Sequence, residues 1–246
     1  MNTFKKIGLT ALGTSLVASS AIAADFTVSG DAGYTWSSEQ VGSSPGTADG
    51  IGYNHDISIS GSGELDNGWS VSTNMILIED SSLSSSHVKL TMGSMGSVLV
   101  GNGYGGVGQG YDAVTPTAYE ENHDGMKTAT AVDNIGSGLD NGQIQYMSPS
   151  FDMMGGSISF AYEWAPEAND VVVGEGGVSA NGTEKDFGSG QGLGVKVNYG
   201  GLSLGAYANE RTKNTGAAGK DGDASDSTWF ANYTMGPVSV GYQAGM

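Results

Sequence analysis

The first group of residues whose spacing could do chemistry is a glycine-rich stretch. Residues 103–108 read G-Y-G-G-V-G and follow an apolar run at 97–100, which is half of the context of a dinucleotide-binding turn. The other half is a helix, and residues 109–118 contain Pro116 and Gly-flanked turns instead. No βαβ spacing surrounds the motif, so we do not expect nucleotide binding.

A second group has the alternate spacing of a calcium loop. Asp221, Asp223 and Ser225 match its first, third and fifth positions. Asp226 stands where the loop needs Gly, and Asn232 stands where it needs Glu. We therefore expect no cofactor and no dedicated metal site, and treat Asp221 and Asp223 as the one weak candidate, for loosely bound Ca²⁺ on an acidic loop.

Catalytic groups are sparse. The sequence has no Cys, which removes thiolate catalysis and disulfides, and its three histidines, His55, His87 and His123, lie in unrelated contexts. No G-x-S-x-G nucleophile elbow lies at a strand-to-helix turn. Among the histidines only His55 lies within a predicted strand near its loop end, and it shares the apolar face of Tyr53 and Ile57. We expect a protein that is not an enzyme.

Charge excludes another class of function. The chain has 26 Asp and Glu against 9 Lys and Arg, a net charge of −17. Removing Lys5 and Lys6 with a leader segment changes this to −17 − 2 = −19. Such a surface repels phosphate backbones, so nucleic-acid binding is not expected.

The leader is residues 1–23. Lys5 and Lys6 precede an apolar and small-residue stretch at 7–18, and Ala21-Ile22-Ala23 forms an A-x-A cleavage site. This arrangement predicts a secretory signal peptide, because an apolar stretch of about 12 residues is too short to span a membrane. The mature chain would begin at Ala24.

After the leader, one pattern of alternating apolar and polar residues repeats. Phe26, Val28, Tyr34 and Trp36 alternate with polar or small residues, which is the period of a β-strand with one apolar face. The same period predicts eleven strands, at 26–36, 51–65, 69–77, 88–92, 97–101, 143–148, 157–164, 193–199, 202–209, 229–235 and 238–242.

The connections alternate in length. Short ones occur at 66–68, 93–96, 151–156, 200–201 and 236–237, and mostly longer, polar ones at 37–50, 79–86, 102–142, 165–191 and 210–228. Short turns at one end and long loops at the other are typical of an outer-membrane β-barrel. An aromatic girdle is expected at each end, with Trp36, Tyr53, Trp164 and Trp229 toward the loops and Trp69 and Tyr199 toward the turns. A soluble β-sandwich would place such residues mid-strand.

At 145–162 the residues resemble a known family. The stretch Q-Y-M-S-P-S-F at 145–151, a Gly-containing turn and S-I-S-F-A-Y at 157–162 are similar to the Tyr-x-Ser-Pro-x-Phe stretch and following strand of Gram-negative general-diffusion porins, most closely alphaproteobacterial ones. The first strand and the Gly-rich exit at 99–103 fit the same family. The resemblance implies an all-β, antiparallel transmembrane barrel of the 16-stranded porin type, assembled as a homotrimer.

In that family the third outer loop folds into the pore, and here the third long connection is 102–142. Its six acidic residues oppose one lysine, Lys127. From them we assign a constriction to Asp112, Glu120, Glu121 and Asp124. Basic wall residues are expected opposite the loop, on inward-facing strand positions, and three fit this pattern: Lys89, Lys196 and Arg211. Since the basic side is thin, a cation preference is expected.

The length carries one more expectation. The last residues, 243–246, fall partway through the eleventh predicted strand, and 16 strands at about twenty residues each would need roughly 320. Residues 24–246 are therefore expected to be a porin barrel domain incomplete at its C-terminus, and this chain as given is not expected to assemble into a functional pore.

The expected function is passive diffusion of ions and small hydrophilic solutes across the cell outer membrane, in contact with its lipid and lipopolysaccharide. The alternative is a non-conducting structural or adhesin barrel with a filled lumen. Inward positions of the predicted strands are mostly Ser, Thr, Asn, Gly and Asp, which favours an open pore.

Overall fold

The computed structural model describes residues 25–40, 47–78, 83–102, 106–111, 114–116, 139, 142–166, 168, 187–213 and 223–246. Its elements are β1 (Asp25–Gln40), β2 (Thr47–Glu64), β3 (Ser70–Leu77), β4 (Leu83–Thr91), η1 (Gly93–Met95), β5 (Ser97–Asn102), α2 (Gly106–Gln109), β6 (Gln143–Met147), β7 (Phe151–Met153), β8 (Gly156–Ala165), β9 (Phe187–Tyr199), β10 (Leu202–Lys213), β11 (Ala224–Met235) and β12 (Val238–Gly245). Within these ranges no helix has the length and apolar character to cross a membrane.

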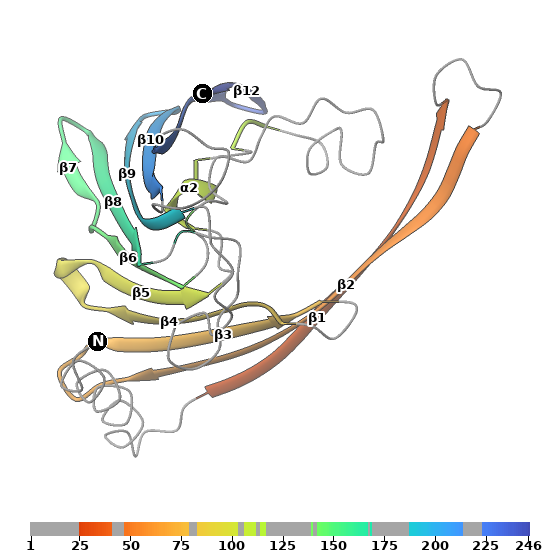
Figure 1. Cartoon of the computed structure of the whole chain (residues 1–246). Helices are drawn as coiled ribbons and strands as arrows, with labels where there is room; N and C mark the ends of the chain where they lie inside the picture. Colours follow the sequence, from red (N-terminus) through yellow and green to blue (C-terminus); the bar gives the residue numbers. More distant parts are fainter. Residues whose placement is uncertain are drawn as a thin grey trace.

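All the strands belong to one antiparallel sheet. They follow one another in sequence order from β1 to β12, except that β7 pairs only with β8. The sheet curves so that α2 lies on its concave side, and the β1–β2 hairpin projects away from the other strands (Figure 1). The predicted all-β, antiparallel fold is confirmed.

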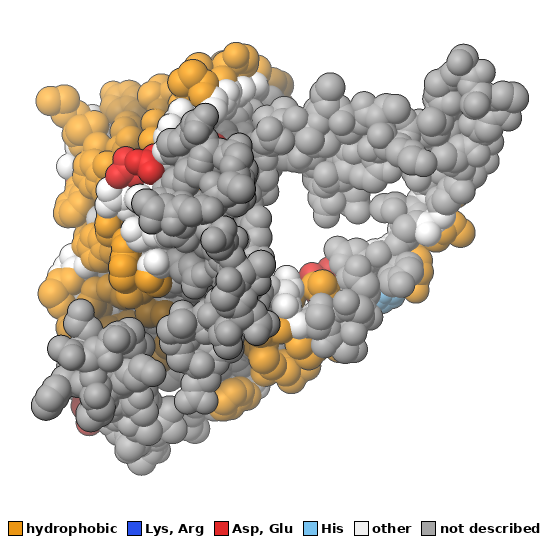
Figure 2. Space-filling model, viewed as in Figure 1, with side chains coloured by type: hydrophobic (Ala, Val, Ile, Leu, Met, Phe, Trp, Pro, Cys, Tyr) orange, Lys and Arg blue, Asp and Glu red, His pale blue; other side chains and the backbone are white. Residues whose placement is uncertain are grey.

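The two faces of the sheet differ in chemistry. Phe160, Val195, Ala206 and Trp229 lie side by side in the register of β8 to β11 and face outward. Other outward positions are also large and exposed, and Figure 2 shows hydrophobic side chains along the outer rim of the sheet. Because side chains alternate along a strand, the inward positions are mostly Ser, Thr, Gly, Asn and charged residues, with a few buried large residues such as Tyr207 and Phe230 among them. This arrangement inverts that of a soluble protein, whose apolar residues face the core.

The structure adds one strand to the eleven predicted. Residues 151–153, which we expected in a short connection, form β7. β6 and β7 both pair with β8, but the register slips by one between Met147↔Ala161 and Phe151↔Ile158. They act as one bulged strand, interrupted at residues 148–150.

Ser148 and Pro149 explain the bulge. Ser148 N–H donates to the Phe160 carbonyl at 2.9 Å, and the Phe160 N–H donates to the Ser148 hydroxyl at 2.8 Å. The hydroxyl thus takes the place of a backbone carbonyl in the ladder, next to a proline that has no N–H to give. The Ser-Pro pair of the 145–151 motif therefore carries a structural role.

Several strands also extend further into the long connections than predicted. β1 reaches Gln40 and β2 begins at Thr47, β9 begins at Phe187, and β10 and β11 extend to Lys213 and back to Ala224. These extensions consist mostly of polar and small residues. They therefore lack the alternation of apolar and polar residues on which the strand predictions rest.

Replacing Ser148 by alanine tests the bulge. Ser148→Ala removes the acceptor of the Phe160 N–H, so we expect the free energy of unfolding to fall by about 1 kcal/mol. Urea unfolding in detergent, followed by tryptophan fluorescence, measures this change. The exposed Ser150→Ala is the control, and an equal loss in both variants would contradict the role of the hydroxyl.

Candidate functional site

The site is built around a segment that lies on the concave face of the sheet. It consists of α2, Gly110 and Tyr111, with residues 114–116 further along. These residues belong to the long connection 102–142 that we expected to fold inward. In Figure 1, α2 lies inside the curve of the strands, near β9 and β10. We call residues 106–111 and 114–116 the docked segment.

A buried carboxylate holds the start of the docked segment. Glu163 points inward from β8 and is fully buried. Its Oε2 accepts the Val107 N–H at 2.6 Å, and its Oε1 accepts the Tyr207 hydroxyl of β10. Gln143 of β6 contributes through both atoms of its side-chain amide. Its NH₂ group donates to Glu163 Oε2 at 2.9 Å, and its oxygen accepts the Gly106 N–H at 2.9 Å.

This arrangement offsets the cost of burying a charge. A carboxylate removed from water is strongly destabilising unless donors replace the lost hydration, and donors to an ionised group form the stronger class of hydrogen bond. Glu163 has three such donors, from α2, β6 and β10. It therefore joins the docked segment to three parts of the chain at once, and the Val107 N–H is not available to bind a phosphate.

Tyr111 forms the apolar part of the contact. It is buried in a cluster with Val107, Tyr207 and Phe230. Its ring stacks on that of Tyr207 with centroids 5.7 Å apart and an interplanar angle of 28°. Burial, assisted by the nearby Glu163 carboxylate, raises the pKa of Tyr111 to about 12, so its phenol remains protonated at neutral pH.

Three glycines at alternate positions of β9 make room for these groups. Gly190, Gly192 and Gly194 face inward, between outward Gln191 and Leu193. A Cβ atom at position 192 would lie 2.7 Å from Glu163 Oε1, and one at 194 would lie 2.5 Å from Cζ of the Tyr111 ring. At 190 it would overlap Leu139. We call these three residues the glycine track.

The docked segment continues across the last strands. Asn232 of β11 donates its amide to the Val114 carbonyl at 2.7 Å, and the Val114 N–H donates to Gln243 of β12 at 3.3 Å. Pro116 lies over Gly241, where a Cβ would meet the proline Cδ at 2.6 Å. The contacts with the sheet therefore extend from β6 to β12.

Of the predicted basic wall residues, Lys196 lies against the docked segment and not across from it. Its Nζ donates to the Gly110 carbonyl at 2.6 Å and lies 4.6 Å from the centroid of the Tyr111 ring. Its expected place on the wall opposite the acidic residues of the loop stays a prediction, because Asp112, Glu120, Glu121 and Asp124 lie outside the described residues.

The other two basic residues also face inward. Arg211 forms an ion pair with Asp226 at 3.0 Å and lies over the Phe187 ring, with its Cζ 4.7 Å from the centroid. Lys89 faces inward from β4, opposite Leu99 in the register. Arg211 is thus neutralised locally, whereas Lys89 has no ion pair within the described ranges.

The predicted acidic constriction lies outside the described residues: Asp112, Glu120, Glu121 and Asp124. The same holds for Asp221, while Asp223 is exposed before β11. The described ranges contain no group of three or more His, Asp or Glu that could hold a metal ion.

Most of the predicted aromatic girdle faces outward. Trp36, Trp164, Tyr199 and Trp229 are exposed on the convex face, and Trp69 is half-buried beside the β2–β3 turn; the side chain of Tyr53 lies outside the described residues. Trp164 lies one residue before the end of β8, but Trp229 lies within β11, because that strand begins earlier than predicted.

Sequence reasoning missed the groups that hold the docked segment. Glu163, Tyr207, Gln143 and Tyr111 have no motif of their own. The glycine track did leave a signal, since G-Q-G-L-G at 190–194 alternates glycine with larger residues. Glycine at every inward position of a strand indicates that something packs closely on that face.

Comparison with known proteins gives one match. A family model described as Gram-negative porin matches residues 8–246. No curated protein matches the chain.

Glu163→Gln tests the anchor. Val107 and Tyr207 donate to different oxygens of Glu163, and glutamine replaces one of these oxygens with an NH₂ group, so one of the two donors loses its acceptor. We expect faster hydrogen exchange at residues 106–111 and a loss of about 1–3 kcal/mol in the free energy of unfolding. Exchange followed by mass spectrometry measures the first. Glu210→Gln on the convex face is the control, and unchanged protection in Glu163→Gln would refute the anchor.

Gly194→Ala tests the glycine track. The new methyl group would occupy the position of the Tyr111 ring, so we expect the segment to shift and Tyr111 to become accessible. Chemical nitration of tyrosine, located by peptide mapping, measures that accessibility. Gly33→Ala on β1 also faces inward and meets no atom within 4 Å, so it should leave Tyr111 protected. Equal nitration of Tyr111 in both variants would argue against close packing of Tyr111 on Gly194.

Proposed function

The chain belongs to the Gram-negative porin family and so to the outer-membrane channel proteins, and from that premise we propose that it passes ions and small hydrophilic solutes by passive diffusion, with a preference for cations. The concave face is then the wall of the lumen and the convex face is the wall toward lipid.

The docked segment is the observation that carries this proposal. A polypeptide that lies on the inner face of β6 to β12 narrows the lumen there, and within the described ranges its printed contacts are with the strands of the wall. Hydrogen bonds that Glu163 accepts and that Lys196 and Asn232 donate fix its position. A channel with a fixed narrow part selects solutes by size and charge.

The charges on the inner face support the cation preference. Asp31 of β1 and Asp56 of β2 lie opposite each other in the register and both face the lumen. Arg211 is neutralised by Asp226, and Lys196 lies under the docked segment. The described charges of β1 and β2 that face the lumen are negative, and of the three predicted basic wall residues Lys89 of β4 is the one without an ion pair or a contact with the docked segment in the described ranges.

The remaining parts of the proposal concern the surroundings of the channel. We infer export by the signal peptide at 1–23, insertion into outer-membrane lipid beside lipopolysaccharide, and assembly as a homotrimer. The exposed apolar side chains of the convex face, among them Phe26, Trp36 and Val240, support contact with lipid or with other subunits.

Planar-bilayer recording tests the channel itself. The full-length protein should give stepwise increases in conductance, and a salt gradient should give a reversal potential of the sign for cation preference. An absence of steps would overturn the channel, and a reversal potential of the anionic sign would overturn the preference.

The double variant Asp31→Asn, Asp56→Asn tests the source of the preference. Each carboxylate contributes about 0.5 kcal/mol to a cation 8 Å away in water, or roughly twofold in occupancy. We expect the reversal potential to move toward zero while the step size changes less. Glu210→Gln removes a charge on the convex face and is the control. If both changes have the same effect, the wall carboxylates do not set selectivity.

A further inference from the structure

The basic side of the lumen wall contains a residue that the sequence analysis did not assign to it. His87 lies on β4, two residues before Lys89, and Val88 between them is exposed on the outward face. Because side chains alternate along a strand, His87 and Lys89 project from the same inward face, about 7 Å apart along β4. His87 is half-buried. The strand therefore presents two nitrogen-bearing side chains toward the lumen.

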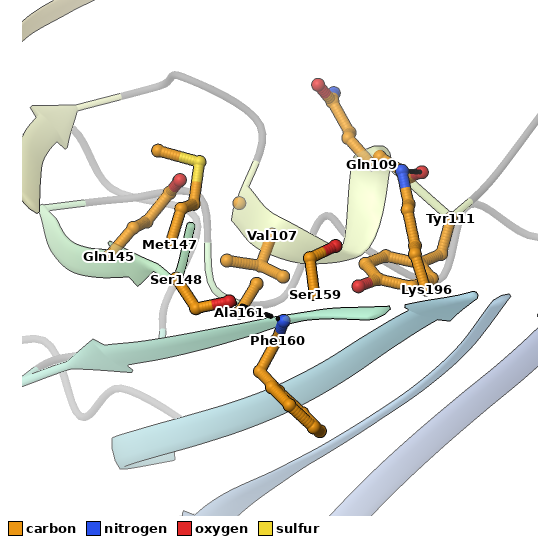
Figure 3. Close-up of a pocket in the computed structure, with 12 residues that line it drawn as sticks. Val107, Gln109, Tyr111, Gln145, Met147, Ser148, Ser159, Phe160, Ala161 and Lys196 are labelled. Atoms are coloured by element: carbon orange, nitrogen blue, oxygen red, sulfur yellow. Dashed lines mark hydrogen bonds between the residues drawn. The ribbon is translucent and has the colours of Figure 1, made fainter. Parts of the chain in front are cut away.

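The other two basic residues of the wall are held by contacts of their own. Lys196 donates to the Gly110 carbonyl at 2.6 Å, and Figure 3 shows its side chain beside that of Tyr111. Arg211 forms an ion pair of 3.0 Å with a carboxylate of β11. Within the described ranges Lys89 has no ion pair. Of the predicted basic wall, β4 thus carries the charge that neither an ion pair nor the docked segment holds.

The neighbours of His87 in the sheet are uncharged apart from Lys89. Its partner in the register is Asn74 on β3 and Gly101 on β5. On its own strand, the inward residues on either side are Ser85 and Lys89. Protonation of His87 therefore adds a positive charge next to that of Lys89.

Histidine is the side chain that changes its charge near neutral pH, because its ordinary pKa of about 6.5 lies in the range from about pH 5 to about pH 8. The sequence has three histidines and no cysteine. His55 faces outward from β2, with its Nε2 3.2 Å from the Tyr34 hydroxyl oxygen. His123 lies outside the described residues. His87 is the histidine that the described strands direct toward the lumen.

We propose that His87 is a specificity-determining residue of the channel. While His87 is neutral, the carboxylates of β1 and β2 set the preference for cations. When it is protonated, β4 carries two positive charges and that preference weakens. This inference rests on the proposed function and deepens it, since it names a group that adjusts the selectivity. One added charge about 8 Å from the path of the ions lowers the occupancy of a cation about twofold.

Reversal potentials of the full-length protein in a salt gradient, recorded at low ionic strength at about pH 8 and about pH 5, test the role of His87. We expect the cation-to-anion permeability ratio of the wild type to fall about twofold at the lower pH. His87→Gln should show a much smaller fall. His55→Gln is the matched control, because His55 faces outward, and it should behave as the wild type. Equal falls in the wild type and His87→Gln would overturn the inference.

His87→Lys is the reciprocal variant, because lysine is charged at both pH values. Its reversal potential at about pH 8 should match that of the wild type at about pH 5, and it should change little between the two conditions. His123→Gln tests the third histidine. A pH effect that disappears in His123→Gln and persists in His87→Gln would overturn the assignment to His87.

A second measurement needs no membrane. The histidine side-chain NMR signals of the detergent-solubilised protein, assigned by their loss in the glutamine variants, report protonation directly. The His87 signal should shift between about pH 8 and about pH 5, and a signal that stays fixed would overturn the inference.

The channel and the role of His87 fail in different ways. An absence of conductance steps, even with a His87 that titrates, would overturn the channel and the selectivity role with it. Conductance steps whose reversal potential is the same at both pH values would overturn the role of His87 and leave the channel.

Discussion

Strict alternation of side chains between two faces is the constraint on which the rest of this structure depends. Each inward residue has outward neighbours on either side, so a functional group on the lumen wall is placed only where the next residues suit lipid. Glu163 shows this clearly, since it is fully buried inside the sheet while Tyr162 and Trp164 are exposed outside it. The wall therefore offers one inward position in two, and the functional groups must share these positions with the residues that hold the docked segment.

The docked segment lies over inward positions that have no side chain. β9 gives three inward positions to glycine, so the strand itself forms a flat surface, and the groups that lie over it come from elsewhere: Tyr207 from β10, Glu163 from β8 and Tyr111 from the segment. Lys196, the next inward residue after the track, lies under the segment that the glycines admit. The anchor and the narrow part are thus consequences of one local arrangement.

The fold was largely predictable from the sequence, whereas the site was only partly so. Period-two alternation located strands such as 157–164 and 202–209 because lipid requires an apolar outer face along the whole span. It missed the polar ends of β1 and β2, where that requirement stops, and β7, where Pro149 interrupts the ladder. The inward direction of Lys196 followed from alternation, but its contact with Gly110 did not, since contacts between residues 86 positions apart leave no periodic trace.

The docked segment also determines when the protein can finish folding. Val114 is held by Asn232 and Gln243, which lie 118 and 129 residues later in the chain. During export the docked segment emerges well before β11 and β12, the strands that hold Val114. Contacts of such long range form slowly because the intervening chain must first be ordered. The lumen therefore acquires its final width only after β11 and β12 have joined the sheet, so that an assembly intermediate has a wider opening than the mature wall.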